Sequence, residues 1–465
     1  MFALTLLSVA FAQDLLITDV RVWDGTGAPA RDGQSILIRD GLIAALNPSA
    51  DALPGPVPVL DGAGALAIPG LIDLHTHLVS NPGGAWRTDD EASRLAQVHQ
   101  ALRAYVACGV TTVLDAGTLP IWAQEVHAWL NAGHTGPEVL DLGVALSPKG
   151  GYLDNAFPGY PSITDIPSLK AAMDASEALG SIGFKVAFEE GFQVPVWPVF
   201  DRAMRDAIVA EAAARHKPLY IHGGGVTELP LALEMKPRVL VHPPDDGSPA
   251  VIQQVIASGA HVTTTLRVAD LFRTGNHPEW LTRPLVRLTV PQAQLDTATA
   301  EGMNQRYLRA VTDVVLPEWG PFRRHLAARV IGSERFNLKG LSVRGGTLRA
   351  LVDAGVLVGM GSDSGNWPVF PYHFHGTNSL KEIELLGTWG LTPEQALLAS
   401  TRDAARLIEV DGRVGTLEPG KEADIVLVRG DPLRVASDIW NIQGTVQDGV
   451  YRTPEGWMQE DARGL

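Results

Sequence analysis

The sequence predicts an α/β protein built on a (β/α)8 TIM barrel, with a small β-sandwich domain formed by both chain ends. Two observations lead to this prediction. Short apolar segments alternate with amphipathic ones through the middle of the chain, which indicates parallel strands joined by crossover helices. Short β-type segments separated by turns occupy both ends instead. A chain of 465 residues with 45% hydrophobic content can bury a core of this size.

The two chain ends are expected to form one composite β domain, from residues 13–66 and 414–456. Residues 35–39 form a β-type segment, and Asp40-Gly41 follows as a hairpin signal. The segment 423–429 near the other end has the same character. We therefore expect the chain to leave this domain after residue 66 and to return to it at residue 414.

The barrel is expected over residues 67–413. Eight apolar segments are its candidate strands, at 71–77, 109–117, 138–146, 183–188, 218–224, 238–244, 261–267 and 356–363. Amphipathic stretches such as 201–216 fall between most of them. The active site of such a barrel lies at the carboxyl ends of its strands.

One connection is too long for a loop. Residues 268–345 separate the seventh and eighth strands, where a few residues are usual. The segment contains Trp280, Tyr307 and Trp319, together with several arginines. We interpret it as a partly helical insertion that is a candidate lid over the barrel mouth.

The first residues indicate export. Residues 1–12 are apolar and end in Ala10-Phe11-Ala12, which is typical of a signal peptide and predicts a periplasmic or secreted protein. The segment has no Lys or Arg, so a cytoplasmic protein remains the alternative. No later stretch reaches the roughly 18 consecutive apolar residues of a membrane span.

Net charge narrows the class of partner. The formal charge is -15, and no cluster of Lys or Arg offsets it, which argues against a nucleic-acid surface. A small molecule is the expected partner, no membrane association is expected, and a homo-oligomer is left open.

Polar side chains end several of the apolar strands. His75 and His77 are two residues apart on the first strand, so both point to one face, and His is the commonest metal ligand. The other candidates end the fourth, fifth, sixth and eighth strands: Lys185, His222, His242 and Asp363. Because all six fall at the same edge of one sheet, they predict a metal site.

Each candidate also has a structural interpretation. His222 or His242 alone is more often a core histidine, and Lys185 alone is usually a surface lysine. Asp363 alone could cap a turn. Their shared position at strand ends makes the metal site the better interpretation of the set.

Further residues are candidates for contact with substrate. Tyr152 follows the third strand and could touch a substrate oxygen, while His373 and His375 follow the eighth strand and could line the pocket. Arg267 and Arg273 follow the seventh strand and could pair with a carboxylate. Such a pair would favour a dipeptide-like or N-acyl amino acid substrate.

Three residues are given no function. Cys108 is the only cysteine and its apolar setting predicts a buried, inert thiol. Glu382 and Glu384 are expected to be solvated charges on the helix after the eighth strand. A serine esterase is also disfavoured, because residues 361–365 carry Asp363 where a nucleophilic serine would stand.

Four segments resemble the amidohydrolase superfamily, in the branch of imidazolonepropionases and Xaa-Pro dipeptidases. They are residues 69–77 (PGLIDLHTH), 361–364 (GSDS), 390–397 (GLTPEQAL) and 415–424 (GTLEPGKEAD). The resemblance extends over nearly the whole mature chain and is weakest over residues 268–345.

The resemblance implies a site with two divalent metal ions, with zinc as the default. His75, His77 and Asp363 would bind the more buried ion, and His222 and His242 the second. Lys185 would carry a carbamate formed with CO2 and would bridge the two ions. Imidazole and oxygen ligands of this mixture suit zinc, manganese, cobalt or nickel.

The implied activity is metal-dependent hydrolysis of a carbon–nitrogen bond, in an amide or cyclic amide. A metal-activated hydroxide would attack the carbonyl, Asp363 would transfer the proton, and His242 would orient the leaving group. A lactonase or phosphotriesterase-type hydrolase is an alternative, as is a mononuclear deaminase that leaves Lys185 unused. A non-catalytic scaffold is disfavoured, because no ligand is missing.

Overall fold

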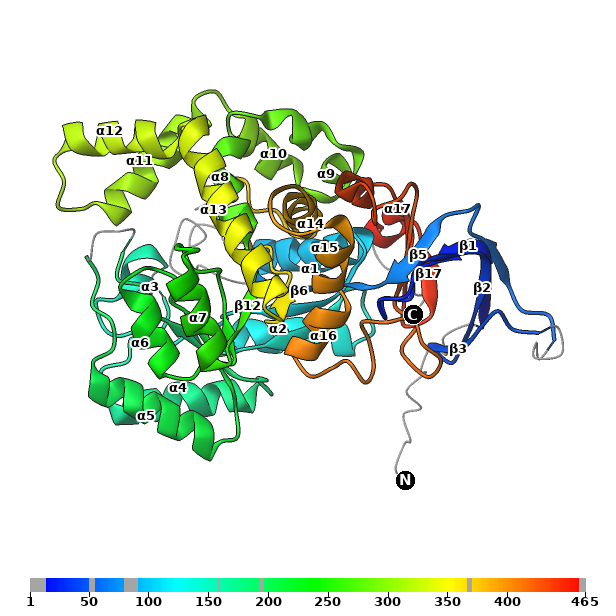
Figure 1. Ribbon diagram of the computed structural model, residues 1–465, viewed down its shortest axis with the longest axis horizontal. Coiled ribbons are helices and arrows are strands. Elements are labelled where there is room, and N and C mark those ends of the chain that lie inside the picture. Colours follow the sequence, from blue (N-terminus) through cyan, green and yellow to red (C-terminus); the bar gives the residue numbers. More distant parts are fainter. Residues whose placement is uncertain are drawn as a thin grey trace.

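The computed structural model describes residues 14–49, 55–78, 91–157, 159–191, 196–365 and 370–459. The expected signal peptide at 1–12 lies outside these residues. Parallel strands surrounded by helices form the larger part of the molecule, and a sheet made from both chain ends lies beside it (Figure 1).

All eight expected parallel strands are present, in the expected order. They pair in two parallel sheets, β14-β6-β7-β8 and β13-β12-β11-β10-β9. Most are shorter than expected: β6 (Leu71–His77), β7 (Val110–Asp115), β8 (Glu138–Asp141), β9 (Phe184–Ala187), β10 (Leu219–His222), β11 (Val239–Leu240), β12 (His261–Thr263) and β13 (Val358–Gly359), followed by β14 (Ser364–Gly365). The expectation of a strand through residue 267 was wrong, because the chain turns into α8 (Leu266–Thr274).

Backbone hydrogen bonds join the two parallel sheets at both edges. Beyond β8, the Leu146 amide donates to the Lys185 carbonyl at 2.9 Å, and the Ala187 amide donates to the Leu146 carbonyl at 2.9 Å. At the other edge, the Leu74 amide of β6 donates to the Met360 carbonyl at 2.8 Å. The strand ends that carry the candidate ligands therefore lie in one connected framework.

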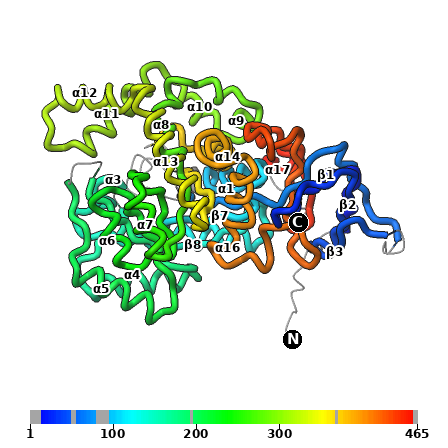
Figure 2. The backbone as a smooth tube through the Cα atoms, in the orientation of Figure 1, coloured from blue at the N-terminus to red at the C-terminus, as the bar shows by residue number. Residues whose placement is uncertain are grey.

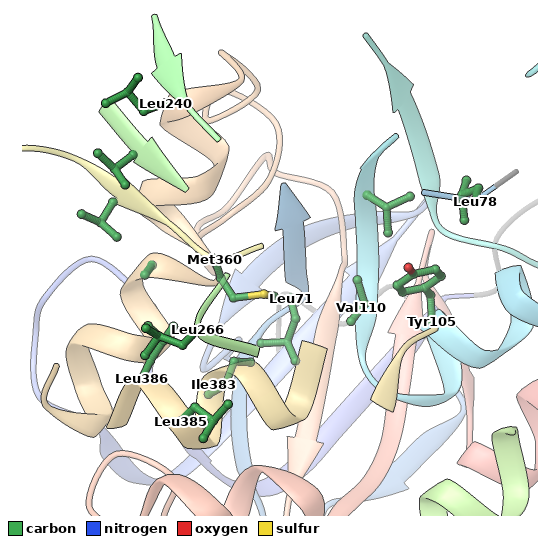
Figure 3. Packing of buried hydrophobic residues seen from close by; sticks show 14 of the residues in the cluster. Leu71, Leu78, Tyr105, Val110, Leu240, Leu266, Met360, Ile383, Leu385 and Leu386 are labelled. Carbon is green, nitrogen blue, oxygen red and sulfur yellow. The ribbon is translucent and has the colours of Figure 1, made fainter. Parts of the chain in front are cut away.

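Helices cover the strands on the outside. The crossover helices are α1 (Glu91–Ala107), α2 (Pro120–Asn131), α3 (Tyr152–Ala156), α4 (Ile166–Ala178), α5 (Arg202–Ala214), α6 (Glu228–Glu234), α7 (Pro249–Ser258) and α13 (Glu334–Asp353), with α14 (Thr377–Trp389), α15 (Pro393–Ala399) and α16 (Arg402–Leu407) after the last strand. Asp165 and Asp201 cap α4 and α5 by accepting backbone amides of the first turn. Ile383 and Leu386 of α14 are buried in one apolar cluster with Leu71 and Met360 (Figure 3).

The segment 268–345 is almost wholly helical. It contains most of α8, then η3 (Pro278–Thr282), α9 (Pro284–Thr289), α10 (Gln292–Thr299), α11 (Met303–Val315), α12 (Pro321–Ile331) and the first half of α13. In Figure 1, α11 and α12 lie at the outer edge of the molecule. Whether this segment acts as a lid stays a prediction.

The chain ends share one eight-stranded sheet. Its order is β17-β16-β15-β5-β1-β2-β3, with β4 also paired to β1. The strands are β1 (Leu15–Val22), β2 (Arg31–Arg39), β3 (Leu42–Leu46), β4 (Val59–Asp61), β5 (Leu66–Pro69), β15 (Ile425–Val428), β16 (Ile442–Gln447) and β17 (Val450–Arg452). Figure 2 shows the blue N-terminal part of the described chain beside its orange and red C-terminal part. The sandwich arrangement and the domain boundaries remain predictions.

The C-terminus returns to the strand-and-helix part. Between β15 and β16 lies η4 (Ala436–Trp440). After β17, the last described element is α17 (Pro454–Met458). Trp457 of α17 is buried against Val106 and Ala107 of α1. Among the described residues, no helix combines the length and the apolar character that crossing a bilayer requires.

Candidate metal centre

His75 and His77 converge on Asp363. Their Nε2 atoms lie 3.4 and 3.2 Å from the Asp363 Oδ1 atom. Their rings are 5.0 Å apart and nearly perpendicular, as expected for alternate residues at the end of a strand. Both imidazoles are therefore directed at one carboxylate oxygen.

The backbone at Asp363 is unusual. Its φ angle is +53°, a left-handed conformation that costs a non-glycine residue about 1–2 kcal/mol. The Asp363 amide donates to the His75 carbonyl at 2.8 Å, which holds the residue in place. A Cβ atom on Gly361 would lie 2.7 Å from the Cβ of His75, so only glycine allows this close approach. Strain of this kind is typical of functional sites.

The buried carboxylate of Asp73 holds the backbone next to two of the candidate ligands, His75 and Asp363. Asp73 Oδ1 accepts the backbone amides of His75 at 3.2 Å and Ser362 at 3.0 Å, and Oδ2 accepts the Ser379 hydroxyl at 2.6 Å. Burial raises the pKa of Asp73 to about 6. Asp73 was not predicted as a site residue, although it lies on the same strand face as the two histidines.

His242 and His222 extend the group of imidazoles. The His242 ring lies 4.9 Å from the His75 ring and 4.4 Å from the His222 ring. His242 Nδ1 bonds the Thr265 hydroxyl at 2.7 Å, and His222 Nε2 bonds Glu189 Oε2 at 3.0 Å. One nitrogen of each ring is therefore held, and the other is left for a ligand.

Glu189 is a second residue that the sequence analysis missed. It lies two residues beyond β9 and was indistinguishable from a solvated loop carboxylate. Burial opposes ionisation, but the bond from His222 holds the pKa of Glu189 below its usual value. The neighbouring Glu228 has the reverse shift, since burial and then the charge of Glu189 raise its pKa to about 8.

Lys185 is buried close to this group, with 4% of its surface exposed. Burial lowers its pKa from 10.5 to about 7, and the charge of Asp363 opposes this only in part. Its charge acts in turn on both His75 and His242. All six residues predicted as ligands are therefore brought together at the strand ends.

The donor set fits a divalent metal ion. Donor atoms of His75, His242 and Asp363 lie within 4.8 Å of one another. Burial lowers the pKa of His75 to about 3 and that of His242 well below its usual value, so both rings are neutral. Although burial opposes it, the bonds from His75 and His77 keep the pKa of Asp363 well below 3.8. Neutral imidazole and ionised carboxylate are the forms that bind metals.

Aromatic rings border the ligands on one side. The Tyr152 ring lies 5.5 Å from the His222 ring and 5.3 Å from that of Trp197. It also lies 5.5 Å from Phe157, which in turn is 5.9 Å from Phe370. These four aromatic residues, Tyr152, Phe157, Trp197 and Phe370, are called the aromatic wall below.

The three side chains predicted to contact substrate, Tyr152, His373 and His375, lie in different surroundings. Tyr152 lies beside the ligands, and His373 is buried against Phe370 with neither ring nitrogen bonded within the described part of the chain. His375 instead bonds the Tyr105 hydroxyl through Nδ1 at 2.9 Å, which indicates a structural role.

Both arginines follow the seventh strand as expected, but their guanidinium groups are paired within the protein. Arg267 lies on α8 and is fully buried, where it donates to Asp270 at 3.3 Å and to the Tyr372 carbonyl at 3.0 Å. Arg273 pairs with Glu334 at 2.8 Å. Because these guanidinium groups are already bonded within the protein, we do not assign them a substrate carboxylate.

The glutamates also differ from expectation. Glu382 is not solvated: it is fully buried and accepts the amides of Leu266 and Arg267 and the Thr264 hydroxyl. Glu384 is also mostly shielded from solvent and bonds the Trp440 indole at 2.8 Å. The alternation of apolar and amphipathic segments, which located the strands, does not predict which face of this helix is buried.

The helical segment reaches the aromatic wall. Val315 and Leu316, at the end of α11, are buried with Trp197 in one cluster that Tyr152 also contacts. Tyr307 of α11 lies 6.0 Å from Phe370, and its hydroxyl is buried with no hydrogen-bond partner among the described residues. The insertion therefore borders the candidate site.

Comparison with known proteins identifies the family of this chain. Residues 66–452 match the amidohydrolase family, which generally uses divalent metals. The chain is similar to an imidazolonepropionase of Solibacter usitatus (strain Ellin6076), with 24% identity over 409 residues, 85% of this chain and 84% of the relative.

Solved structures show the same fold. A Xaa-Pro dipeptidase with methionine in its active site superimposes with a TM-score of 0.70 at 18% identity, over 95% of this chain and 100% of the other. The A. niger ochratoxinase superimposes with a TM-score of 0.69 at 17% identity, over 97% and 99%. The chain is a hydrolase that acts on carbon–nitrogen bonds, and it belongs to the amidohydrolase family.

Proposed function

We propose that this protein hydrolyses an amide or cyclic amide bond of a small molecule with two divalent metal ions. The observation that carries the proposal is the convergence of six side chains from five strand ends: four imidazoles, one carboxylate and one buried lysine. His75, His77 and Asp363 would hold the more buried ion, and His222 and His242 the second. Zinc is the default for this mixture of ligands.

Lys185 would bridge the two ions as a carbamate. An ammonium has no lone pair to offer, whereas the neutral amine can react with CO2 to give an anionic oxygen ligand. The burial of Lys185, which lowers its pKa to about 7, favours the neutral amine. A mononuclear deaminase would leave this buried lysine without a role, so the position of Lys185 disfavours that alternative.

When bound, ions of this kind polarise a carbonyl group and lower the pKa of a water molecule to about 7. Asp363 is ionised and lies between His75 and His77, so it can accept the proton of the attacking water and pass it to the leaving nitrogen. Transfer of this type contributes about 10²–10⁴-fold. Burial keeps the Tyr152 hydroxyl protonated, so it can donate a hydrogen bond to a substrate oxygen.

We infer that the two parallel sheets form a single (β/α)8 barrel. The hydrogen bonds of Leu146 and Met360 at the two junctions support this inference. So does the similarity in fold to the Xaa-Pro dipeptidase. A barrel would place every candidate ligand around one mouth.

The aromatic wall favours a substrate with an apolar or aromatic group beside the scissile bond. Trp197 and Phe157 are buried within it, at 6% and 7% exposure, and they present little polar surface. Dipeptides and N-acyl amino acids with such side chains are the substrates we propose. The names of the relatives, an imidazolonepropionase and a Xaa-Pro dipeptidase, are consistent with carbon–nitrogen bonds of this type.

An activity screen of the metal-loaded enzyme tests the proposal. Dipeptides, N-acyl amino acids, lactones and phosphotriesters would be compared, with Asp363→Asn as a control for contaminating hydrolases. We expect turnover of amides with apolar side chains, and Trp197→Leu should raise KM most for the aromatic ones. Rapid lactone or phosphotriester turnover with no amide hydrolysis would refute the proposal.

A further inference from the structure

Glu228 is a buried glutamate that has no part in the proposed reaction. It is the first residue of α6, and only 2% of its surface is exposed. Burial of a carboxyl group is costly unless its oxygens are hydrogen-bonded, so glutamate is almost never fully buried without partners. The partners of Glu228 therefore indicate what this residue does.

The two oxygens of Glu228 join two loops. Oε1 accepts the Glu190 amide at 2.7 Å, in the loop after β9, and Oε2 accepts the Gly225 amide at 3.1 Å, in the loop after β10. These loops follow neighbouring strands, because β9 and β10 pair in parallel. One carboxyl group therefore fixes the spacing of the two loops that follow the strands of Lys185 and His222.

Each of these loops lies next to one half of a hydrogen bond that orients a candidate ligand. This bond joins Glu189 Oε2 to His222 Nε2 at 3.0 Å. Glu189 directly precedes Glu190, the residue whose amide bonds Oε1 of Glu228. His222 lies three residues before Gly225, whose amide bonds Oε2. The geometry of the bond therefore depends on the spacing that Glu228 sets.

The approach of Glu228 to the second loop is close. A Cβ atom on Gly225 would lie 2.3 Å from Glu228 Oε2, so a larger residue there would displace the carboxyl group. Glu228 also forms a side-chain hydrogen bond with Glu189, and this bond is one of the contacts that hold the pKa of Glu189 below its usual value against the effect of burial. The carboxyl group of Glu228 is thus in contact with both loops and with Glu189 itself.

The loop after β9 also leads to the aromatic wall. The Glu190 carbonyl accepts the Val196 amide at 2.7 Å and the Trp197 amide at 3.1 Å. Trp197 belongs to the aromatic wall, and Glu228 holds the amide of the same Glu190. Glu228 therefore supports the backbone on both sides of the candidate site, beside the ligand His222 and beside the aromatic wall.

We propose that Glu228 is a positioning residue for the candidate metal centre. It holds the loops after β9 and β10 at the spacing at which Glu189 meets His222, and so sets the affinity of the second metal ion. The inference rests on the proposed two-metal function. Removal of a group that orients a metal ligand typically weakens metal binding about 10–100-fold.

Zinc titration of the metal-free protein against a competing chromophoric chelator tests the proposal. Glu228→Leu removes both acceptors, and we expect it to weaken binding of the weaker of two zinc ions by about 10–100-fold. Glu228→Gln keeps the shape and one acceptor, so the expected loss is about 3–10-fold. Glu234→Gln, at a glutamate on the same helix whose side chain is 66% exposed, is the matched control and should bind zinc as the wild type does.

A double-mutant cycle separates positioning from a general effect on the fold. Because Glu228 acts through Glu189, Glu228→Leu should change zinc affinity less than about threefold in a Glu189→Ala background. Equal weakening in both backgrounds would overturn the proposal, and so would wild-type affinity in Glu228→Gln and Glu228→Leu. Failure of the proposed function has a different signature, since the wild type itself would then bind fewer than two zinc ions, which would overturn both.

Discussion

Lys185→Met should stabilise the metal-free protein while abolishing its activity. Lys185 is 4% exposed, and burial lowers its pKa from 10.5 to about 7. A lysine whose pKa is lowered on folding costs stability wherever it is charged in the unfolded chain. The difference of about 3.5 pKa units lowers the free energy of unfolding by about 4 kcal/mol at pH 7. At this pH, half of the folded molecules already carry a neutral Lys185.

The sign of this effect sets its pH dependence. The cost is greatest below pH 7, falls as the pH rises from 7, and vanishes above about 10.5, where the unfolded lysine is neutral too. Methionine has similar length and no charge, so it should recover most of the cost. The variant should nevertheless lose turnover, because a thioether cannot carry a carbamate.

Chemical denaturation of the chelator-treated protein measures this directly. Unfolding free energies of wild type, Lys185→Met and Lys339→Met would be compared at pH 6, 7, 8 and 9. We expect a gain of several kcal/mol for Lys185→Met at pH 6–7, shrinking as the pH rises, and none for the exposed Lys339→Met. A destabilised Lys185→Met, or a gain independent of pH, would refute the reasoning.

Three further predictions concern the carboxylates Asp363, Glu189 and Asp424. Asp363→Asn should lower kcat by about 10²–10⁴-fold in metal-loaded enzyme, as steady-state kinetics would show; wild-type rates would contradict its role. Glu189→Ala should weaken metal binding by about 10–100-fold, because His222 loses the group that orients it, and titration with a competing chelator would detect this. Burial raises the pKa of Asp424 to about 8, so its contribution to stability is present below pH 4 and lost as the pH rises to 8. In Asp424→Asn, stability should depend less on pH, and the melting temperature at pH 8.5 should be higher than that of the wild type. An unchanged slope of stability against pH would contradict the raised pKa of Asp424.

The ligand positions could be predicted because a polar residue at the end of an apolar strand is visible in the sequence. His75, His222 and Asp363 each interrupt such a segment, and the strand order brought them together as expected. The supporting residues were not visible in this way. Asp73 lies inside its strand, and Glu189 lies two residues beyond β9, where a solvated carboxylate is the ordinary expectation.

The helical segment was the hardest part to predict. The seventh strand was expected to run through residue 267, whereas β12 ends at Thr263 and Arg267 lies on α8. Its burial depends on Asp270 and on the Tyr372 carbonyl, which is 105 residues away in sequence. Contacts at such separation leave no local signal, and the insertion as a whole matches the family resemblance least.

Metal content is the most direct test of the central claim, that six side chains hold two ions bridged through Lys185. Elemental analysis of the purified enzyme, after dialysis against metal-free buffer, would give the number of ions per chain. We predict two divalent ions in the wild type, and one or fewer in Lys185→Met with its fold intact. A single ion in the wild type, or two tightly held ions in Lys185→Met, would contradict this account.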